Sequence, residues 1–280
     1  MPFDLSPRIA FIDLDGTFYR WSFYIDLIEQ LMKFQQGLPA NFFESQAHRK
    51  TWQEQSLNDD VYLSQFIHEW ESRAIMGLSD SELTLAVHQV LRKQKARVYI
   101  FTRELLAVLK EQGYRLVAFG GSPQPIVQEL CREWKFDEWY GTQYVTDQRR
   151  VYTRDQSKAK RIEEAKAELV RDVLKQGALR DGSIALGDTL NDWSVLKQVE
   201  HPIAFNPEQT LHLKARQTGI PVVWERKNVI TAYRTNPETL GTHGNAFLFH
   251  EIPWTNLFPK DVAEPLTRRL RALDQIPPAG

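Results

Sequence analysis

The stretch FIDLDGTFYR, residues 11–20, ends an apolar run on two carboxylates. The run begins at Ile9 and has the length and composition of a buried strand. Asp13 and Asp15 follow it directly, with one residue between them. Like charges held this close raise the free energy of the folded state unless a cation or a shared proton compensates them. The sequence therefore predicts that distant segments bring compensating groups to the end of this strand.

The composition is that of an ordinary soluble globular protein, with 42% hydrophobic and 25% charged residues among 280. A formal net charge of −1 gives no electrostatic attraction to nucleic acid or to an anionic membrane. No apolar run approaches the roughly 18 residues of a spanning helix, and the first residues lack a signal-peptide pattern. The single cysteine, Cys131, cannot form an internal disulfide, which favours a reducing compartment. We therefore predict a cytoplasmic protein that binds neither nucleic acid nor membrane.

Short apolar runs recur along the chain, and each is followed by a turn and a helical pattern. Strands that alternate with helices predict an α/β fold with a doubly wound, Rossmann-like parallel sheet. Ligands of such sheets bind beyond the carboxyl ends of the strands, where Asp13, Gly120 and Asp188 all fall. The predicted strands are residues 8–12, 115–119, 183–187, 202–205 and 220–224.

About a hundred residues separate the first two predicted strands, far more than a crossover needs. Their apolar residues have helical spacing, and Ser79 with Glu82 forms a capping-box pattern. We predict a helical cap over the crevice at residues 18–96, with residues 1–17 and 97–230 forming the α/β core. The alternative is an independent helical domain, but its entry point directly after the two aspartates favours the cap.

Two further segments have weaker patterns. Residues 138–153 alternate enough to predict a small β-hairpin. Residues 231–280 form a C-terminal extension that mixes turn residues with aromatic side chains before a short helical pattern. This extension either packs on the core, which we favour, or contributes to the interface of a homodimer.

A third acid, Asp188, follows a predicted strand, and Asp192 comes four residues later. Together with Asp13 they would form an oxygen-rich site that suits Mg²⁺. The metal would offset the repulsion among the acids and neutralise charge on a bound phosphoryl group. Asp13 is then available as a nucleophile that forms an aspartyl-phosphate, and Asp15 can act as general acid and base.

Small and basic residues complete this predicted site. Gly16 lets the backbone turn closely under a phosphate, and Thr17 can donate a hydrogen bond that holds Asp15 in place. Phosphoryl transfer also requires a basic side chain to balance negative charge. The candidates lie on one amphipathic stretch, with Lys158 at its start and two competitors further along, Lys160 and Lys166.

These motifs resemble those of the haloacid dehalogenase (HAD) superfamily. DLDGT, a glycine-serine turn, a downstream lysine and GDTLND occur in the order of its four motifs, over residues 8–225. The chain is most similar to the phosphoserine-phosphatase-type branch, which carries a helical cap between its first two motifs. The resemblance implies that Asp13 is the nucleophile and Asp15 the acid and base. It also implies Mg²⁺ held by Asp13, the Asp15 backbone carbonyl and Asp188, with Asp192 either a ligand or a support.

The resemblance also assigns the third and second motifs. SKAKR matches the GKxxR pattern of this branch and selects Lys158. In the second motif, Gly120 stands where the branch has a phosphate-binding serine. Gly120 and Gly121 can still offer backbone N–H groups to a phosphate. Ser122 would either supply the missing hydroxyl or cap the following helix, and both alternatives remain open.

The expected function is Mg²⁺-dependent hydrolysis of a small soluble phosphate ester through an aspartyl-phosphate. Arg20 replaces the acid that phosphoserine phosphatases carry near this position, and Glu71 falls where their cap arginine is expected. A substrate other than phosphoserine is therefore expected, with Arg20 either contacting its anionic group or forming a surface ion pair. The alternatives are a phosphotransferase or phosphomutase, and a catalytically weakened binding protein of the same fold, which Gly120 suggests.

Overall fold

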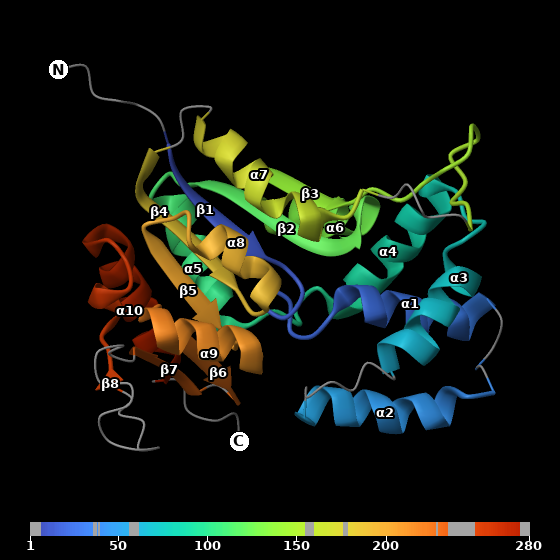
Figure 1. Ribbon diagram of the computed structural model, residues 1–280, viewed down its shortest axis with the longest axis horizontal. Coiled ribbons are helices and arrows are strands. Elements are labelled where there is room, and N and C mark those ends of the chain that lie inside the picture. The colour runs from blue at the N-terminus through green and yellow to red at the C-terminus, as the bar shows by residue number, and fades with distance from the viewer. Residues whose placement is uncertain are drawn as a thin grey trace.

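An eight-stranded sheet with the order β3-β2-β1-β4-β5-β6-β7-β8 forms the centre of the computed structural model. The structure describes residues 7–35, 38, 40–55, 62–154, 160–175, 179–227, 229–234 and 250–274. Strands β1 to β6 pair in parallel, whereas β7 and β8 add antiparallel to one edge (Figure 1). The strands are β1 (Arg8–Asp13), β2 (Arg115–Pro123), β3 (Glu138–Thr142), β4 (Leu179–Gly187), β5 (His201–Phe205), β6 (Val222–Arg226), β7 (Val229–Arg234) and β8 (His250–Glu251).

The predicted α/β class and the five predicted strands are confirmed, as β1, β2, β4, β5 and β6. The predicted hairpin at residues 138–153 is wrong in its first half, because residues 138–142 pair in parallel with β2. Its second half does turn back on itself: an antiparallel bridge joins Thr146 to Tyr152, and the Thr153 N–H donates to the Val145 carbonyl at 3.1 Å. Alternation along a strand indicates which side chains share a face, but it does not select the partner strand.

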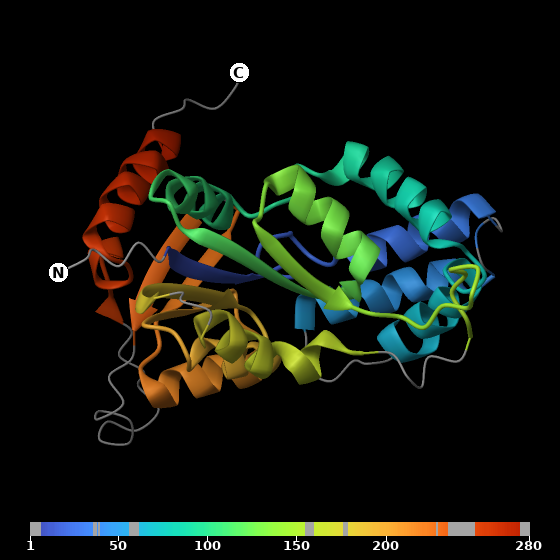
Figure 2. The ribbon, with the colours of Figure 1, turned by 90° about the horizontal axis from the view of Figure 1, so that it is seen from above.

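Alternate side chains of β1 enter two different cores, one on each face of the sheet. Ile9 and Phe11 pack on one face, whereas Ala10 and Ile12 pack on the other, and all four are fully buried. Figure 2 shows the resulting three layers of helix, sheet and helix. The first face is covered by α7 (Ile162–Lys175), α8 (Trp193–Leu196) and α9 (Gln209–Thr218), and the second by α5 (Ile100–Glu111), α6 (Gln124–Trp134) and α10 (Lys260–Asp274).

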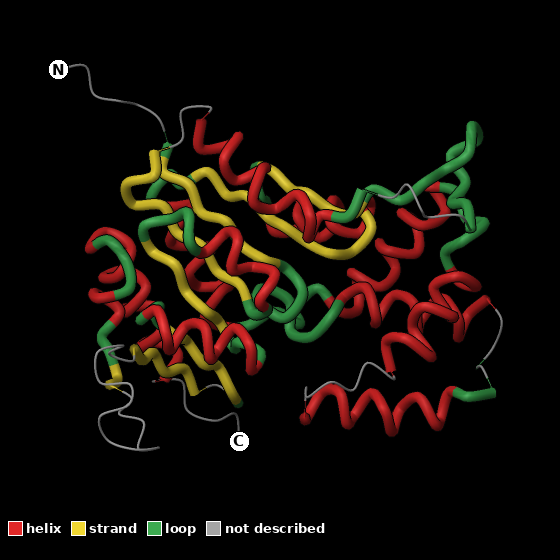
Figure 3. The backbone as a smooth tube through the Cα atoms, viewed as in Figure 1, coloured by secondary structure: helices red, strands yellow, loops and turns green. Residues whose placement is uncertain are grey.

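The residues between β1 and α5 form helices that gather beside the sheet (Figure 3). Their capping box is confirmed, because the Ser79 side chain accepts a hydrogen bond from the Glu82 N–H and the Glu82 carboxylate accepts one from the Ser79 N–H. The buried side chains of these helices continue the apolar cluster on the α5 and α6 side of the sheet. The helices are α1 (Phe23–Gln35), α2 (Phe42–Gln55), a π-helical turn (Tyr62–Ile67), α3 (His68–Ala74) and α4 (Asp80–Gln94).

The chain segments that enter and leave these helices are hydrogen-bonded to each other. The Arg20 N–H donates to the Arg97 carbonyl at 2.7 Å, and the Tyr99 N–H donates to the Phe18 carbonyl at 3.0 Å. This antiparallel pairing directly follows the two aspartates of the first motif. The inserted helices are therefore anchored at the carboxyl end of β1.

The described residues near the C-terminus pack on the core. Helix α10 lies against α5, and Phe258 and Leu266 are buried between them and the sheet. The Trp254 ring lies 5.3 Å from that of Phe101 on α5. In the described part of the chain, every helix is too short or too polar to cross a lipid bilayer.

Candidate active site

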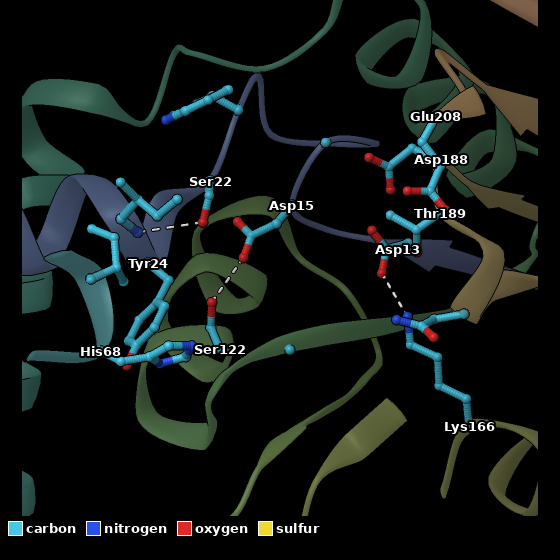
Figure 4. Close-up of a pocket in the computed structure, with 16 residues that line it drawn as sticks. Asp13, Asp15, Ser22, Tyr24, His68, Ser122, Lys166, Asp188, Thr189 and Glu208 are labelled. Atoms are coloured by element: carbon cyan, nitrogen blue, oxygen red, sulfur yellow. Dashed lines mark hydrogen bonds and ion pairs between the residues drawn. The ribbon is translucent and has the colours of Figure 1, made fainter. Parts of the chain in front are cut away.

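A pocket of about 510 Å³ lies at the carboxyl end of β1, between the strand ends and the inserted helices (Figure 4). The core supplies its acids and Lys166, and the inserted residues supply a mainly apolar and aromatic wall that also carries His68. Segments far apart in the sequence therefore meet at one site. The core side includes Asp13, Asp15, Gly121, Ser122, Lys166 and Asp188, and the wall includes Trp21, Ser22, Tyr24, Ile25, Ile67 and His68.

One buried lysine of this pocket pairs with two acids. The Lys166 Nζ donates to Asp13 Oδ1 at 2.9 Å and to Asp192 Oδ1 at 2.6 Å. Carboxylate oxygens of Asp13, Asp188 and Asp192 lie within 4.8 Å of one another. The compensating groups that the first motif requires are thus an ammonium from α7 and the loop after β4.

The acids of this cluster are electrostatically strained. Burial, followed by the charge of Asp192, raises the pKa of Asp13, and Lys166 only partly opposes this. Burial and the charge of Asp13 likewise raise the pKa of Asp188 well above its usual range. Burial disfavours the charged form of Lys166, but the two carboxylates that it contacts raise its pKa overall. With one ammonium among three acids, the ionised cluster keeps two negative charges, which a divalent cation would balance.

Asp192 has both carboxylate oxygens engaged by protein donors. Its Oδ2 accepts from the N–H groups of Asp188 and Thr189, each at 3.1 Å, while its Oδ1 accepts from Lys166. Asp192 therefore orients Lys166 and the loop that carries Asp188. Thr17 contributes to the same loop, because its hydroxyl donates to Asp188 Oδ1 at 3.3 Å and not to Asp15 as predicted.

Asp15 occupies a separate environment from Asp13. Its Oδ1 accepts from the Phe23 N–H at 2.8 Å, at the start of α1, and its Oδ2 accepts from the Ser122 hydroxyl at 2.9 Å. Burial raises the pKa of Asp15, although these two hydrogen bonds oppose the shift. The helix-cap alternative for Ser122 is wrong, because the N-cap of α6 is Pro123 and makes no side-chain hydrogen bond.

The predicted contact between Gly120 and substrate is not supported by the position of this residue. Gly121 and Ser122 line the pocket, whereas Gly120 does not. A Cβ at Gly120 would lie 2.9 Å from Val127 Cγ2 and 3.1 Å from Leu14 Cδ1, in the packed interior. A serine at position 120 would therefore have its Cβ against Val127 and Leu14 and would need these neighbours to shift. Gly120 gives no reason to consider the site weakened.

Of the two alternatives for Arg20, a substrate contact or an ion pair, the structure shows the ion pair. The Arg20 guanidinium forms an ion pair with Glu225 on β6 and donates to the Val98 carbonyl at 3.1 Å. The buried Glu225 carboxylate also accepts from the N–H groups of Ile100 and Phe101 at the start of α5. Arg20 is not among the described residues that line the pocket. Arg20 thus joins the segment that enters the inserted helices to the core, through an ion pair with a buried acid.

The lysine selected from the sequence, Lys158, lies outside the described residues. Lys166, named only as a competitor, is the lysine that the structure places in the pocket. A detectable signal was present in the sequence: Ile162, Lys166 and Val170 recur every four residues, and all three are buried on one face of α7. A lysine on the apolar face of an amphipathic helix is rare unless its charge is paired.

A substitution at Gly16 tests how closely the first motif approaches Asp188. Its φ of +87° is one that glycine adopts readily, and a Cβ there would lie 1.9 Å from Asp188 Oδ2. Gly16→Ala is expected to lower the free energy of unfolding by about 1 kcal/mol through backbone strain and by about 2 kcal/mol more through the clash with Asp188. Urea unfolding measures this loss. Gly113→Ala is the matched control, since Gly113 has φ +73° and nothing within 4 Å of its Cβ position. Equal losses in the two variants would contradict the close approach of Gly16 to Asp188.

Fold and site together define a three-layer α/β protein with an acid-lined pocket, beside a helical insertion after the first strand. The family model of haloacid dehalogenase-like hydrolases matches residues 10–197 of the 280, so the chain belongs to this family. The resemblance inferred from DLDGT and GDTLND is thereby confirmed. None of the curated proteins compared with the chain matches it.

Solved structures show the same fold. A protein of unknown function from Bordetella pertussis Tohama I has a TM-score of 0.57 and 17% identity, covering 78% of this chain and 98% of that one. A substrate-bound phosphoserine phosphatase complex has a TM-score of 0.51 and 20% identity, covering 74% and 90%. A phospho-aspartyl intermediate analogue of phosphoserine phosphatase has a TM-score of 0.50 and 20% identity, covering 75% and 91%. At these identities the likeness concerns the fold.

Proposed function

We propose that this protein is a Mg²⁺-dependent phosphomonoesterase that hydrolyses a small phosphate ester through an aspartyl-phosphate intermediate. One observation carries the proposal: Asp13 and Asp15 share a pocket but have different partners. Asp13 is paired with the Lys166 ammonium, and Asp15 is held by the Phe23 N–H and the Ser122 hydroxyl. Two carboxyl groups kept in separate environments can take the two roles that phosphate-ester hydrolysis needs, nucleophile and proton carrier.

The residues of the pocket fit a Mg²⁺ ion. Buried carboxylate oxygens are the donors that this metal prefers, and the cluster keeps negative charge that Lys166 alone does not balance. We assign Asp13, Asp188 and the Asp15 backbone carbonyl as ligands, with Asp192 as the support that orients them. When bound, the metal supplies electrostatic stabilisation of the charge that develops on the phosphoryl oxygens.

The first chemical step uses Asp13 and Asp15. A carboxylate oxygen of Asp13 attacks phosphorus, and the bond from phosphorus to the ester oxygen breaks. Asp15 in its protonated form gives its proton to the departing oxygen, so that a neutral alcohol leaves. The raised pKa of Asp15, caused by burial, supports a protonated form at the start of this step. The Lys166 ammonium stabilises negative charge beside Asp13.

The second step returns the enzyme to its starting state. Asp15, now a carboxylate, accepts a proton from a water molecule that attacks the phosphorus of the aspartyl-phosphate. The bond between phosphorus and the Asp13 oxygen breaks, and inorganic phosphate leaves. The Ser122 hydroxyl and the Phe23 N–H stabilise the Asp15 carboxylate during this step. The same carboxyl group thus acts first as acid and then as base.

We further propose that residues 18–96 act as a cap that selects the leaving group and excludes water. Their helices supply the apolar and aromatic wall of the pocket, opposite the acids. A cap that moves relative to the core would admit the ester, close during the reaction and release the alcohol. The substrate is expected to be a small soluble molecule, because the pocket measures about 510 Å³.

Metal removal tests this function. Hydrolysis of p-nitrophenyl phosphate is expected to require Mg²⁺, to stop on addition of EDTA and to return with excess Mg²⁺. Mg²⁺ at a hundred times its dissociation constant should also stabilise the fold by about 2.7 kcal/mol, seen as a higher melting temperature. Asp188→Asn should lose most of this stabilisation. Full activity in EDTA, or an equal Mg²⁺ effect in Asp188→Asn, would argue against the proposed metal site.

A further inference from the structure

A histidine, His68, lines the pocket on the side remote from Asp13 and Asp188. Figure 4 shows Tyr24 and His68 on the other side of the Asp15–Ser122 pair from the acid cluster. The His68 side chain is 67% exposed, whereas that of Glu71 behind it is only 14% exposed. The imidazole is therefore accessible from the pocket, while its carboxylate partner is shielded.

This histidine lies at ion-pair distance from a carboxylate that tyrosine hydroxyls hold in place. The Glu71 carboxylate lies 3.7 Å from His68 Nδ1 through Oε2, and its Oε1 accepts from the Tyr144 hydroxyl. The Tyr24 and Tyr144 hydroxyls are 3.3 Å apart. Because Tyr144 gives its proton to Glu71, Tyr24 donates to Tyr144. This arrangement places an acceptor-only carboxylate on the Nδ1 side of His68, which favours a proton on that nitrogen.

The local charges favour an anion. The neighbouring Glu71 carboxylate raises the pKa of His68, although burial and the nearby Arg161 guanidinium oppose the shift. Burial opposes ionisation of Glu71, but the neighbouring His68 and the hydrogen bond from Tyr144 lower its pKa overall. Protonated His68 and Arg161 together exceed Glu71 by one positive charge, which matches one carboxylate. The apolar side chains Ile25 and Ile67 line the same wall and leave His68 as its basic side chain.

We propose that His68 is a specificity-determining residue that binds a carboxylate on the leaving group of the substrate. Glu71 is its positioning residue, and Trp21 and Tyr24 pack against the body of the leaving group. The substrate class is then the phosphate esters of hydroxy-carboxylic acids. This inference rests on the proposed phosphatase function, which it extends by naming the chemistry of the alcohol.

Matched substrates test this assignment. The phosphate esters of glycolate and of 4-hydroxybenzoate carry a carboxylate at two different distances from phosphorus. Each is compared with the ester of its carboxamide, which has nearly the same shape and no charge. The wild-type enzyme with Mg²⁺ is expected to prefer the carboxylate ester of at least one pair by tenfold or more in kcat/KM, mainly through KM, because a charged hydrogen bond is lost with the carboxamide.

Variants locate the preference. His68→Gln is expected to reduce the ratio between carboxylate and carboxamide esters by about tenfold. His68→Glu should reverse the preference and favour an aminomethyl ester, which a merely structural role would not do. His88→Gln is the matched control, because His88 is another cap histidine, 3.2 Å from Glu129, on α4 and outside the pocket. It should keep the wild-type ratio.

The outcomes separate this inference from the proposed function. Equal hydrolysis of both members of each pair, or an unchanged ratio in His68→Gln, overturns the role of His68 and leaves the phosphatase function intact. If the wild-type enzyme hydrolyses none of the esters, the proposed function fails. In that case the corresponding phosphonates, in which carbon replaces the ester oxygen, are used as ligands that cannot be hydrolysed. Calorimetry then compares the affinities of the carboxylate and carboxamide phosphonates. Equal affinity of wild-type enzyme for carboxylate and carboxamide phosphonates would overturn the inference by itself.

Discussion

Asp13→Asn is expected to lower turnover of p-nitrophenyl phosphate by about four orders of magnitude or more, because the variant lacks the attacking carboxylate. The amide occupies nearly the same volume and its oxygen can still accept the hydrogen bond from Lys166. The fold should therefore survive, and circular dichroism checks this. The loss should appear in kcat, since the remaining pocket still binds the ester.

Trapping of the covalent intermediate separates the roles of the two acids. In Asp15→Asn, Asp13 should still attack the phosphorus of an ester with a good leaving group, but the variant lacks the base that activates water for the second step. Mass spectrometry should therefore detect a phosphoryl group on Asp13 in Asp15→Asn and none in Asp13→Asn. Asp172→Asn, on the exposed face of α7, is the control for a lost surface carboxylate and should resemble the wild type. A phosphoryl adduct on the Asp13→Asn protein would refute the assignment of the nucleophile.

Lys166→Met is expected to lower kcat/KM by about three orders of magnitude, since one preorganised charge beside the reacting phosphoryl group is lost. Methionine has a similar length but no charge, so Asp13 and Asp192 lose their shared partner. Breaking a buried ion pair from one side costs about 3 kcal/mol or more. For a chain of this size that corresponds to a fall of about 5 °C or more in melting temperature. Steady-state kinetics and thermal unfolding measure the two effects.

Two further lysine variants serve as a control and as a test of the competing candidate. Lys175→Met, at the exposed end of the same helix, should change neither activity nor melting temperature. Lys158→Met tests the lysine that the GKxxR resemblance selects. An inactive Lys158→Met protein beside an active Lys166→Met protein would show that the motif alignment, and not the hydrogen bonds of Lys166, identifies the functional lysine.

The sequence predicted most of the sheet and the acids that meet at its edge. The strand ends were visible because an apolar run stops at Asp13 and another stops just before Asp188. Parallel strands bring their carboxyl ends to one edge, so both acids could be placed in one pocket from the sequence alone. Strands β3, β7 and β8 were missed as members of the sheet, because the partner of a short edge strand is chosen by contacts far away in the sequence.

Three residues had roles that the sequence left undecided, for one reason. A local pattern shows which residue types are present at Lys166, Ser122 and Arg20, but it does not show toward which partner each side chain points. Ser122 can cap a helix or face Asp15, and only the path of β2 decides that it faces Asp15. Arg20 could face a ligand or an acid of the core, and it faces the core because β6 places Glu225 beside it.

By itself the sequence determined the α/β class, the helical insertion after the first motif and the family to which the chain belongs. These properties depend on local periodicity and on short motifs, which neighbouring residues encode. The tertiary structure decided which lysine meets Asp13, which carboxylates share it and which cap residues line the pocket. Those contacts join residues as far apart as Asp13 and Lys166. Their geometry is set by the packing of α7 and the inserted helices against a twisted sheet, which no local pattern specifies.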